Sequence, residues 1–467
     1  MISSRYVFED QAVLWDVARD LRSGQIRPID FPGQSYDSSL EAIPAAVLGG
    51  LGLGDARAFS TGMLLVALAA WLGLAAALAR RSLSWLAAAT TLLPVAMTVD
   101  NSAVALMWVT AAPRTLAVLA AAAALGVRGE QPRWALAVAL GGLAMILDSS
   151  SALLVVPVLI WMIGERRGVP WRPVAIGLAV PVFVLLIRTL GHRANPAYDL
   201  HPPPDLRVGR KPLEWHIRNP TRAFAEYGPE LFHSPWLRTA AVVAALGAIG
   251  LVALRRGNTA SRAATAAAAL GLLLFLSTNG SLRSVEFDTP LPSAGRGLMA
   301  LPFVMVFLTA TLSDSGRRSA HRATFAAVAG LALLGIVHRT ATDAPGDFVR
   351  EVTATTAVDL VDVGEIGERC ERIAGAMRAA ETTIALSWNS TTAWACSASL
   401  PDDSTVLFPP YERRTWELER ALDISQHRWV VWQDGRVEIV ETRPIAWRDA
   451  ATVVGLDVRP LPPDWPR

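Results

Sequence analysis

Long apolar runs separated by short arginine-rich loops constrain this chain more than any other feature. A helix needs about 20 apolar residues to cross a bilayer, and fewer if neighbours surround it. The charged residues, 18% of the chain, are also fewer than a soluble protein of 467 residues carries. The chain is therefore predicted to be a polytopic α-helical membrane protein. Ten segments are predicted to span: 57–79, 83–99, 114–126, 134–148, 150–163, 173–190, 239–254, 263–277, 295–312 and 323–338.

For the third, fourth and fifth of these segments, a tilted or re-entrant path is an alternative. Every second loop between the segments is rich in arginine, which indicates the cytoplasmic side. The basic loops begin at Arg80, Arg128, Arg166, Arg255 and Arg317. The alternate loops are poor in arginine, apart from the long loop 191–238, which is basic and is still assigned to the outside. Residues 1–56 and 340–467 are then predicted to be extracytoplasmic.

The N-terminal segment 1–56 has no apolar run that would carry it across the membrane. It carries four arginines, and amphipathic segments with that many arginines resist unaided transfer. We therefore expect a spanning helix before the first residue of the given sequence, with unaided transfer as the alternative.

After Arg339 the composition becomes that of an ordinary soluble domain. Helices are predicted at 365–380 and 411–422, and strands at 383–388, 428–432 and 437–440. This alternation indicates a small α/β domain over 340–467, beside a first outer loop at 1–56 and a transmembrane domain at 57–339. The two cysteines, Cys370 and Cys396, fit no zinc motif. They form either a disulfide, which an outer compartment would preserve, or two buried thiols.

The first outer loop carries the most informative pattern. Residues 10–23 are predicted to form a helix that Gly24 ends. The stretch Asp10-Gln-Ala-Val-Leu and the segment from Phe31 to Glu41 resemble the first outer loop of bacterial GT-C membrane glycosyltransferases, relatives of the protein O-mannosyltransferases and aminoarabinose transferases. Four residues match a Gly-Gln-x-Tyr-x-x-x-x-Glu segment of one branch: Gly33, Gln34, Tyr36 and Glu41. Gln11 stands where the family usually has Glu. Residues 295–302 and 408–413 resemble later family motifs.

The resemblance implies a GT-C-like fold and a transfer of sugar from a polyprenyl-phosphate lipid to an extracytoplasmic acceptor, without a cofactor and with metal dependence open. Such a reaction needs a base for the acceptor and a cation for the leaving phosphate. The residue matched to the family's opening acid, Asp10, is the candidate base, although an Asp there could instead cap the helix. The candidate substrate-binding residues are Glu9, Gln34, Tyr36, Glu41 and Arg296.

Each candidate also has a structural interpretation. Glu41 could hold the loop through Gln34 and Tyr36, and an interfacial arginine such as Arg296 is often a membrane anchor. The further acids Asp16 and Asp20 are interpreted as a solvated helix face. Asp148 and the serines after it, at an outer helix end, are either caps or site residues.

Two other functions stay open on the sequence alone. A transporter or flippase is one, although transporters usually place polar groups at mid-membrane, where these segments carry almost none. A non-catalytic envelope-assembly protein on the same scaffold is the other. The net charge of +2 gives no reason to expect a nucleic-acid partner.

Overall fold

The computed structural model describes most of the chain, which folds into two compact units. The terminal unit contains residues 1–63, 187–202 and 352–467, and the helical unit contains 64–186 and 203–351. The described residues are 6–7, 9–24, 42–96, 112–194, 205–225, 234–282, 285–286, 298, 300–313, 361–387, 389–400, 404–407, 428–433 and 436–441.

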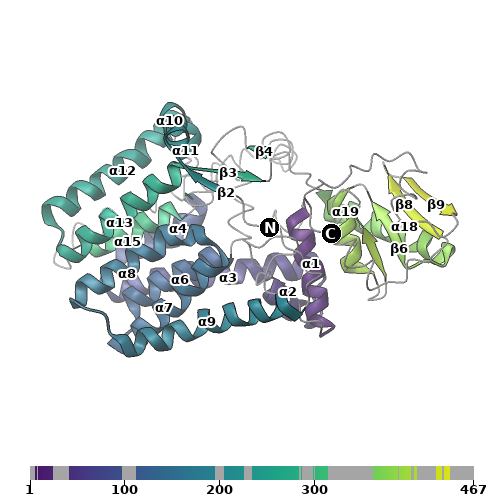
Figure 1. Cartoon of the computed structure of the whole chain (residues 1–467), viewed down its shortest axis with the longest axis horizontal. Helices are drawn as coiled ribbons and strands as arrows, with labels where there is room; N and C mark the ends of the chain where they lie inside the picture. Colours follow the sequence, from purple (N-terminus) through teal and green to yellow (C-terminus); the bar gives the residue numbers. More distant parts are fainter. Residues whose placement is uncertain are drawn as a thin grey trace. The chain divides into compact units, whose positions relative to one another are not determined.

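Apolar helices dominate the helical unit (Figure 1). They are α3 (Asp55–Arg80, which starts in the terminal unit), α4 (Ser84–Ala96), α6 (Ala112–Gly126), α7 (Glu130–Leu147), α8 (Ala152–Arg166, preceded by the 3₁₀ turn η2, Ser149–Ser151), α9 (Trp171–Ala194, which ends in the terminal unit), α12 (Pro235–Arg256), α13 (Thr259–Leu276) and α15 (Leu301–Leu312). Nine of the ten predicted segments lie on these helices, and the tenth, 323–338, lies outside the described residues. Among the described helices, five are long and apolar enough to cross a membrane: α3, η2 with α8, α9, α12 and α13.

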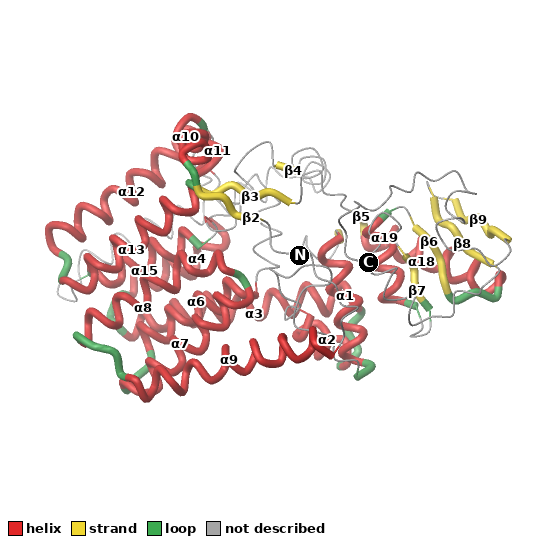
Figure 2. Tube along the Cα trace, in the orientation of Figure 1, coloured by secondary structure: helices red, strands yellow, loops and turns green. Residues whose placement is uncertain are grey.

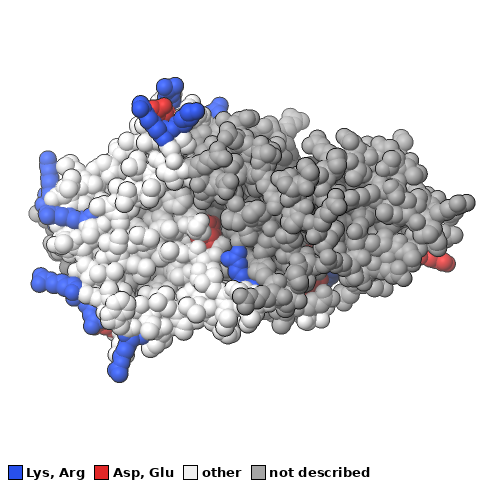
Figure 3. Space-filling model, in the orientation of Figure 1, with Lys and Arg blue, Asp and Glu red and all other residues white. Residues whose placement is uncertain are grey.

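The helices of this unit bury small residues against each other and expose large apolar ones. A side chain at Gly164 of α8 would meet Ala260 of α13 at 2.8 Å, and one at Gly126 of α6 would meet Ala77 of α3 at 2.6 Å. Such contacts let helix backbones approach closely, as membrane helices require. In contrast, Phe183 of α9 and Leu254 of α12 are 61% and 72% exposed. Figure 3 shows the charged side chains gathered near helix ends, with a wide uncharged surface between them. This pattern is that of a lipid-facing bundle.

One aromatic residue organises the arginine-rich ends of these helices. Trp161 of α8 is buried, and the guanidinium groups of Arg81 and Arg133 lie 4.9 and 5.0 Å from its ring centroid. Both arginines reach the carboxylate of Glu165, at 3.8 and 2.5 Å. Their Nε–H groups donate to Leu125 and Ala124, carbonyls in the last turn of α6. The arginines thus cap a helix C-terminus, where positive charge is stabilising.

Replacing Trp161 should destabilise the helical unit. Trp161→Ala removes a buried ring and two cation–π contacts, and truncating a buried Trp typically costs about 3–5 kcal/mol. We expect a clearly lower melting temperature for the detergent-solubilised protein. Trp171→Ala is the matched control, because Trp171 is 75% exposed. Equal melting temperatures for the two variants would show that the cluster contributes nothing.

The long loop between α9 and α12 contributes short elements of its own. Strand β2 (Asp205–Val208) pairs antiparallel with β3 (Thr278–Leu282), which pairs with β4 (Val285–Glu286). Two short helices follow β2: α10 (Arg210–Arg218) and α11 (Pro220–Phe224). The buried His216 fastens α10 to the end of α13, because its Nδ1 lies 2.9 Å from the carbonyl of Pro212 and 3.0 Å from that of Leu276. Burial lowers the pKa of His216, which favours the neutral ring.

The terminal unit combines an N-terminal helix with an α/β domain (Figure 2). Its elements are β1 (Tyr6–Val7), α1 (Glu9–Arg22), α2 (Ala42–Gly50), β5 (Val361–Asp362), α18 (Val363–Ala380), β6 (Ile384–Ser387), α19 (Ser390–Ser399), β7 (Thr405–Leu407), β8 (Arg428–Gln433) and β9 (Arg436–Glu441). The four-stranded sheet has the order β7-β6-β8-β9, in which β6 is parallel to both neighbours and β9 is antiparallel to β8. The predicted α/β character is confirmed, while the predicted helix at 411–422 lies outside the described residues.

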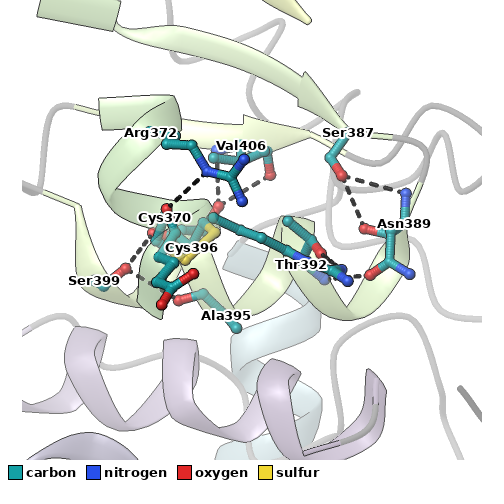
Figure 4. The surroundings of a disulfide bond; sticks show 12 residues. Cys370, Arg372, Ser387, Asn389, Thr392, Ala395, Cys396, Ser399 and Val406 are labelled. Carbon is teal, nitrogen blue, oxygen red and sulfur yellow. Dashed lines mark hydrogen bonds between the residues drawn. A yellow bond between two sulfur atoms is a disulfide. The ribbon is translucent and has the colours of Figure 1, made fainter. Parts of the chain in front are cut away.

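Three elements of this domain, β5, α19 and β7, were not predicted. The α19 sequence consists mainly of Ser, Thr, Ala and Cys, so it shows no apolar stripe. Its start is set by Asn389, whose Oδ1 accepts a hydrogen bond from the backbone N–H of Thr392 at 2.7 Å. A disulfide joins Cys396 of α19 to Cys370 of α18, with the Cα atoms 4.9 Å apart (Figure 4). Of the two alternatives for the cysteines, the structure therefore has the bridge.

Candidate active site

Helix α1 carries the predicted base in its first turn. The helix begins at Glu9, one residue before the predicted range of 10–23, so Asp10 is its second residue and does not occupy the cap position. The predicted stop is confirmed, because Gly24 adopts φ +82° directly after the helix. From Gln11 to Ala18 every residue is buried. A helix enclosed to this degree has a fixed position, and so has the backbone of its first turn.

The helix is enclosed because it packs on α19 of the C-terminal domain and on α2. Its apolar residues Val13, Leu14 and Val17 are 3% exposed or less. The short strand β1, just before α1, also pairs antiparallel with β5, just before α18. Two segments about 350 residues apart in the chain thus form one structure.

A buried ion cluster reinforces this packing. Nη2 of Arg19 lies 3.2 Å from a carboxylate oxygen of Asp16 and 3.2 Å from one of Asp20. The same guanidinium donates through Nη1 to the backbone carbonyl of Ser397 in α19. Both aspartates are 1% exposed, so the prediction that Asp16 and Asp20 form a solvated helix face is wrong. The C-terminal domain covers this face, and the N-terminal segment taken alone carries no sign of that cover.

The other predicted site residues cannot be placed in this way. Gln34, Tyr36, Glu41 and Arg296 lie outside the described residues, and of Glu9 and Asp10 only the backbone, at the start of α1, is described. Their convergence with Asp10 therefore stays a prediction. The neighbouring chain gives partial positions: α2 begins directly after Glu41, and Leu298, two residues after Arg296, is fully buried.

Sequence reasoning missed one cation, Arg238. It lies in the first turn of α12, at the end that was predicted to be outside, and is only 7% exposed. One turn later on the same helix face, Val242 packs with Leu298 and Leu301, which follow Arg296. A buried arginine therefore lies on the helix face that packs against Leu298 and Leu301. Its position four residues into an apolar run was the available signal.

The remaining candidate, Asp148, has a structural role in the described chain, and so has the buried His216. Asp148 lies between α7 and η2, and its Oδ1 accepts a hydrogen bond from the N–H of Ser150 at 2.8 Å, which is a cap. His216 holds α10 to the end of α13. Among the described residues, no group of three or more His, Cys, Asp or Glu side chains could hold a metal ion.

Removing the guanidinium of Arg19 should loosen α1. Arg19→Met leaves Asp16 and Asp20 buried without this cation, and breaking a buried pair in this way typically costs about 3–5 kcal/mol. We expect a lower melting temperature and faster proteolysis within α1. Arg22→Met is the matched control, because the Arg22–Asp55 pair, at 2.8 Å, is a quarter exposed and such pairs contribute about 0–1 kcal/mol. A control as destabilised as Arg19→Met would contradict the assignment.

Comparison with known proteins finds similarity in fold and no match in sequence. No protein-family model matches the sequence, and no curated protein matches it. Two solved structures are similar over almost the whole chain, both of ArnT from Cupriavidus metallidurans. The apo structure gives a TM-score of 0.54 at 13% identity, covering 96% of this chain and 95% of that one. The structure bound to undecaprenyl phosphate gives 0.51 at 14% identity, covering 95% of each.

Identities this low establish the fold alone. The sequence resemblance to the GT-C enzymes, which include the aminoarabinose transferases, is confirmed at that level. The chain is a polytopic α-helical membrane protein with the GT-C fold of ArnT and a small C-terminal α/β domain.

Proposed function

We propose that this protein is a GT-C-type membrane glycosyltransferase that moves a sugar from a polyprenyl-phosphate lipid to an acceptor outside the membrane. The observation that carries the proposal is the placement of α1: the helix that opens the matched loop is enclosed and fixed, with Asp10 in its first turn. The shared fold supports the donor class, because one of the similar ArnT structures is bound to undecaprenyl phosphate.

The proposed reaction is a base-assisted displacement at the anomeric carbon. The Asp10 carboxylate accepts the proton of the acceptor nucleophile as that atom bonds to the anomeric carbon. The bond between this carbon and the phosphate oxygen breaks, and the lipid phosphate leaves with the electron pair. Arg296 stabilises the growing phosphate charge, and the missed cation Arg238 is a second candidate for this role. Glu9, Gln34, Tyr36 and Glu41 hold the donor sugar and the acceptor.

The described helices give less support to a transporter. Two charged side chains are buried in the helical unit among the described residues, Asp148 and Arg238, and each lies at or near a helix end. A transport pathway would favour ionisable groups at mid-membrane. A non-catalytic envelope-assembly protein remains the alternative that the assays below distinguish.

The orientation of the chain is part of the proposal. Residues 1–56 and the C-terminal domain are placed outside the cytoplasm, with the arginine-rich loops inside. The packing of α1 on α19 supports a common side for the first two, because packed segments cannot lie on opposite faces of a membrane. The Trp161 cluster likewise brings the basic ends of α3, α7 and α8 together.

Cysteine labelling in intact cells tests the orientation cleanly, because the two native cysteines are bridged. An introduced cysteine is then the sole free thiol. An impermeant maleimide should label Ser23→Cys, at the exposed end of α1, in intact cells. Gly168→Cys, in a basic loop with open space around it, should be labelled after permeabilisation only. The reverse pattern would refute the orientation.

A single substitution tests the catalytic assignment. Membranes containing the protein are first incubated with a panel of radiolabelled polyprenyl-phosphate sugars to find the donor. Asp10→Asn keeps the size of the side chain and removes the base, so transfer should fall about 10²–10⁴-fold while undecaprenyl phosphate still binds. Glu214→Gln is the control, because Glu214 of α10 forms an exposed pair with Arg210.

Each outcome has a defined meaning. Wild-type transfer by a folded Asp10→Asn protein would refute the role of Asp10 as the base. No transfer by the wild-type protein from any donor in the panel would favour the non-catalytic alternative.

A further inference from the structure

The terminal unit contains a pocket that the proposed chemistry does not yet use. It has a volume of about 920 Å³ and lies between Trp15 of α1, residues 54–57 around the start of α3, the first turns of α18 and the end of α19. Small-molecule sites typically measure about 300–1,000 Å³. Trp15 lies five residues after Asp10 on the same helix, so the pocket belongs to the structure that positions the proposed base.

The pocket has an apolar floor and a charged rim. Trp15, Ile366 and Leu400 contribute buried side chains, whereas Arg57 and Glu371 are exposed. The indole Nε1–H of Trp15 is buried and has no hydrogen-bond acceptor among the described residues. A buried donor without a partner often indicates a missing ligand or water. An apolar surface bordered by a few polar groups is the usual composition of a ligand site.

The walls of the pocket are held in place. The disulfide between Cys370 and Cys396 joins α18 to α19, and Figure 4 shows the pocket residues Ala395 and Ser399 on the same helix as Cys396. On the opposite wall, Arg22 pairs with Asp55 at 2.8 Å. Two of the lining residues, Gly54 and Gly367, have no side chain. A Cβ atom added at either would meet no atom within 4 Å, so both positions leave space in the pocket.

The charges of the lining decide which chemical class fits. Among the described lining residues, the carboxylates of Asp55, Asp362 and Glu371 face the guanidinium of Arg57, and Arg22 pairs with Asp55, so carboxylates outnumber guanidinium groups by one. This surplus of one negative charge disfavours a phosphate group relative to a neutral or cationic one. Hydroxyl groups can donate to the carboxylates and accept from the guanidinium, and an amine would gain further attraction.

We propose that this pocket is the acceptor subsite and that it binds a hydroxyl-rich, sugar-like group that is neutral or carries an amine. The assignment to the acceptor rests on the proposed function; the preference for the ligand class rests on the pocket alone. The lining charge disfavours the donor lipid phosphate there, so donor and acceptor would occupy separate places, as a transfer reaction requires.

Ligand binding to the full chain in nanodiscs tests the proposal without any transfer assay. Saturation-transfer NMR is recorded with three probes that differ in charge: glucose, glucosamine and glucose 6-phosphate. We expect signals from glucose and glucosamine, the stronger from glucosamine, and none from glucose 6-phosphate. Absence of both expected signals, or binding of the phosphorylated sugar alone, would overturn the proposal.

Two glycines of α18 supply a matched pair of variants. Gly367→Phe fills the pocket, and Gly375→Phe places the same side chain on the same helix in open space away from the pocket. Both changes replace a helical glycine and so favour the helix. Loss of signal in Gly367→Phe with retention in Gly375→Phe is expected. Retention in both, or equal loss in both, would refute the site.

A charge variant separates this proposal from the proposed function. Glu371→Gln should weaken glucosamine binding severalfold more than glucose binding, whereas Glu368→Gln, exposed on α18 outside the pocket, should change neither. An unchanged ratio in Glu371→Gln would refute the charge argument. If the sugars bind but no donor in the panel supports transfer, the pocket stands and the glycosyltransferase assignment falls.

Discussion

The contact of Arg19 with Asp16, Asp20 and the backbone of Ser397 is the interaction on which the terminal unit depends. It joins a helix near the start of the chain to one near its end, and it does so with buried charges. Buried ion pairs add little net stability compared with apolar packing, but they are costly to break. Such a contact therefore favours one register of α1 on α19 over its alternatives. That register sets the position of the first turn of α1.

In the helical unit, small residues allow close helix packing and arginines connect the helix ends. Its helices need close contact without a hydrophobic driving force between them, and small residues such as Gly164 and Ala260 provide it. At the basic ends, Arg81 and Arg133 cap α6, contact Trp161 and share Glu165. These arginines were recognised in the sequence as topology signals. The structure shows that they also bind the helices to each other, so one pair of residues fulfils both roles.

Structural features that depend on local sequence pattern could be predicted, whereas burial that depends on residues far away in the chain could not. Apolar runs identified the apolar helices of the helical unit, because burial in lipid demands long uninterrupted segments. The stop of α1 followed from Gly24. The burial of Asp16 and Asp20 could not be predicted, since their cover, α19, lies about 370 residues away and has no apolar stripe itself. Arg238 was missed for a similar reason: its burial arises from α12 packing near Leu298, and its position near the start of an apolar run was the only local signal.

The enclosure of α1 also bears on what Asp10 can do. A residue whose only task is to start a helix should stand at the cap position, where its side chain replaces a missing backbone partner. Position 10 is instead the second residue of the helix, within the first turn, where the helix dipole favours a negative charge. A base must be ionised before it can accept a proton, so this position suits the catalytic role better than the capping role. The same dipole acts on Glu9, one residue earlier in the same turn, so the choice of Asp10 over its neighbour rests on its match to the family's opening acid.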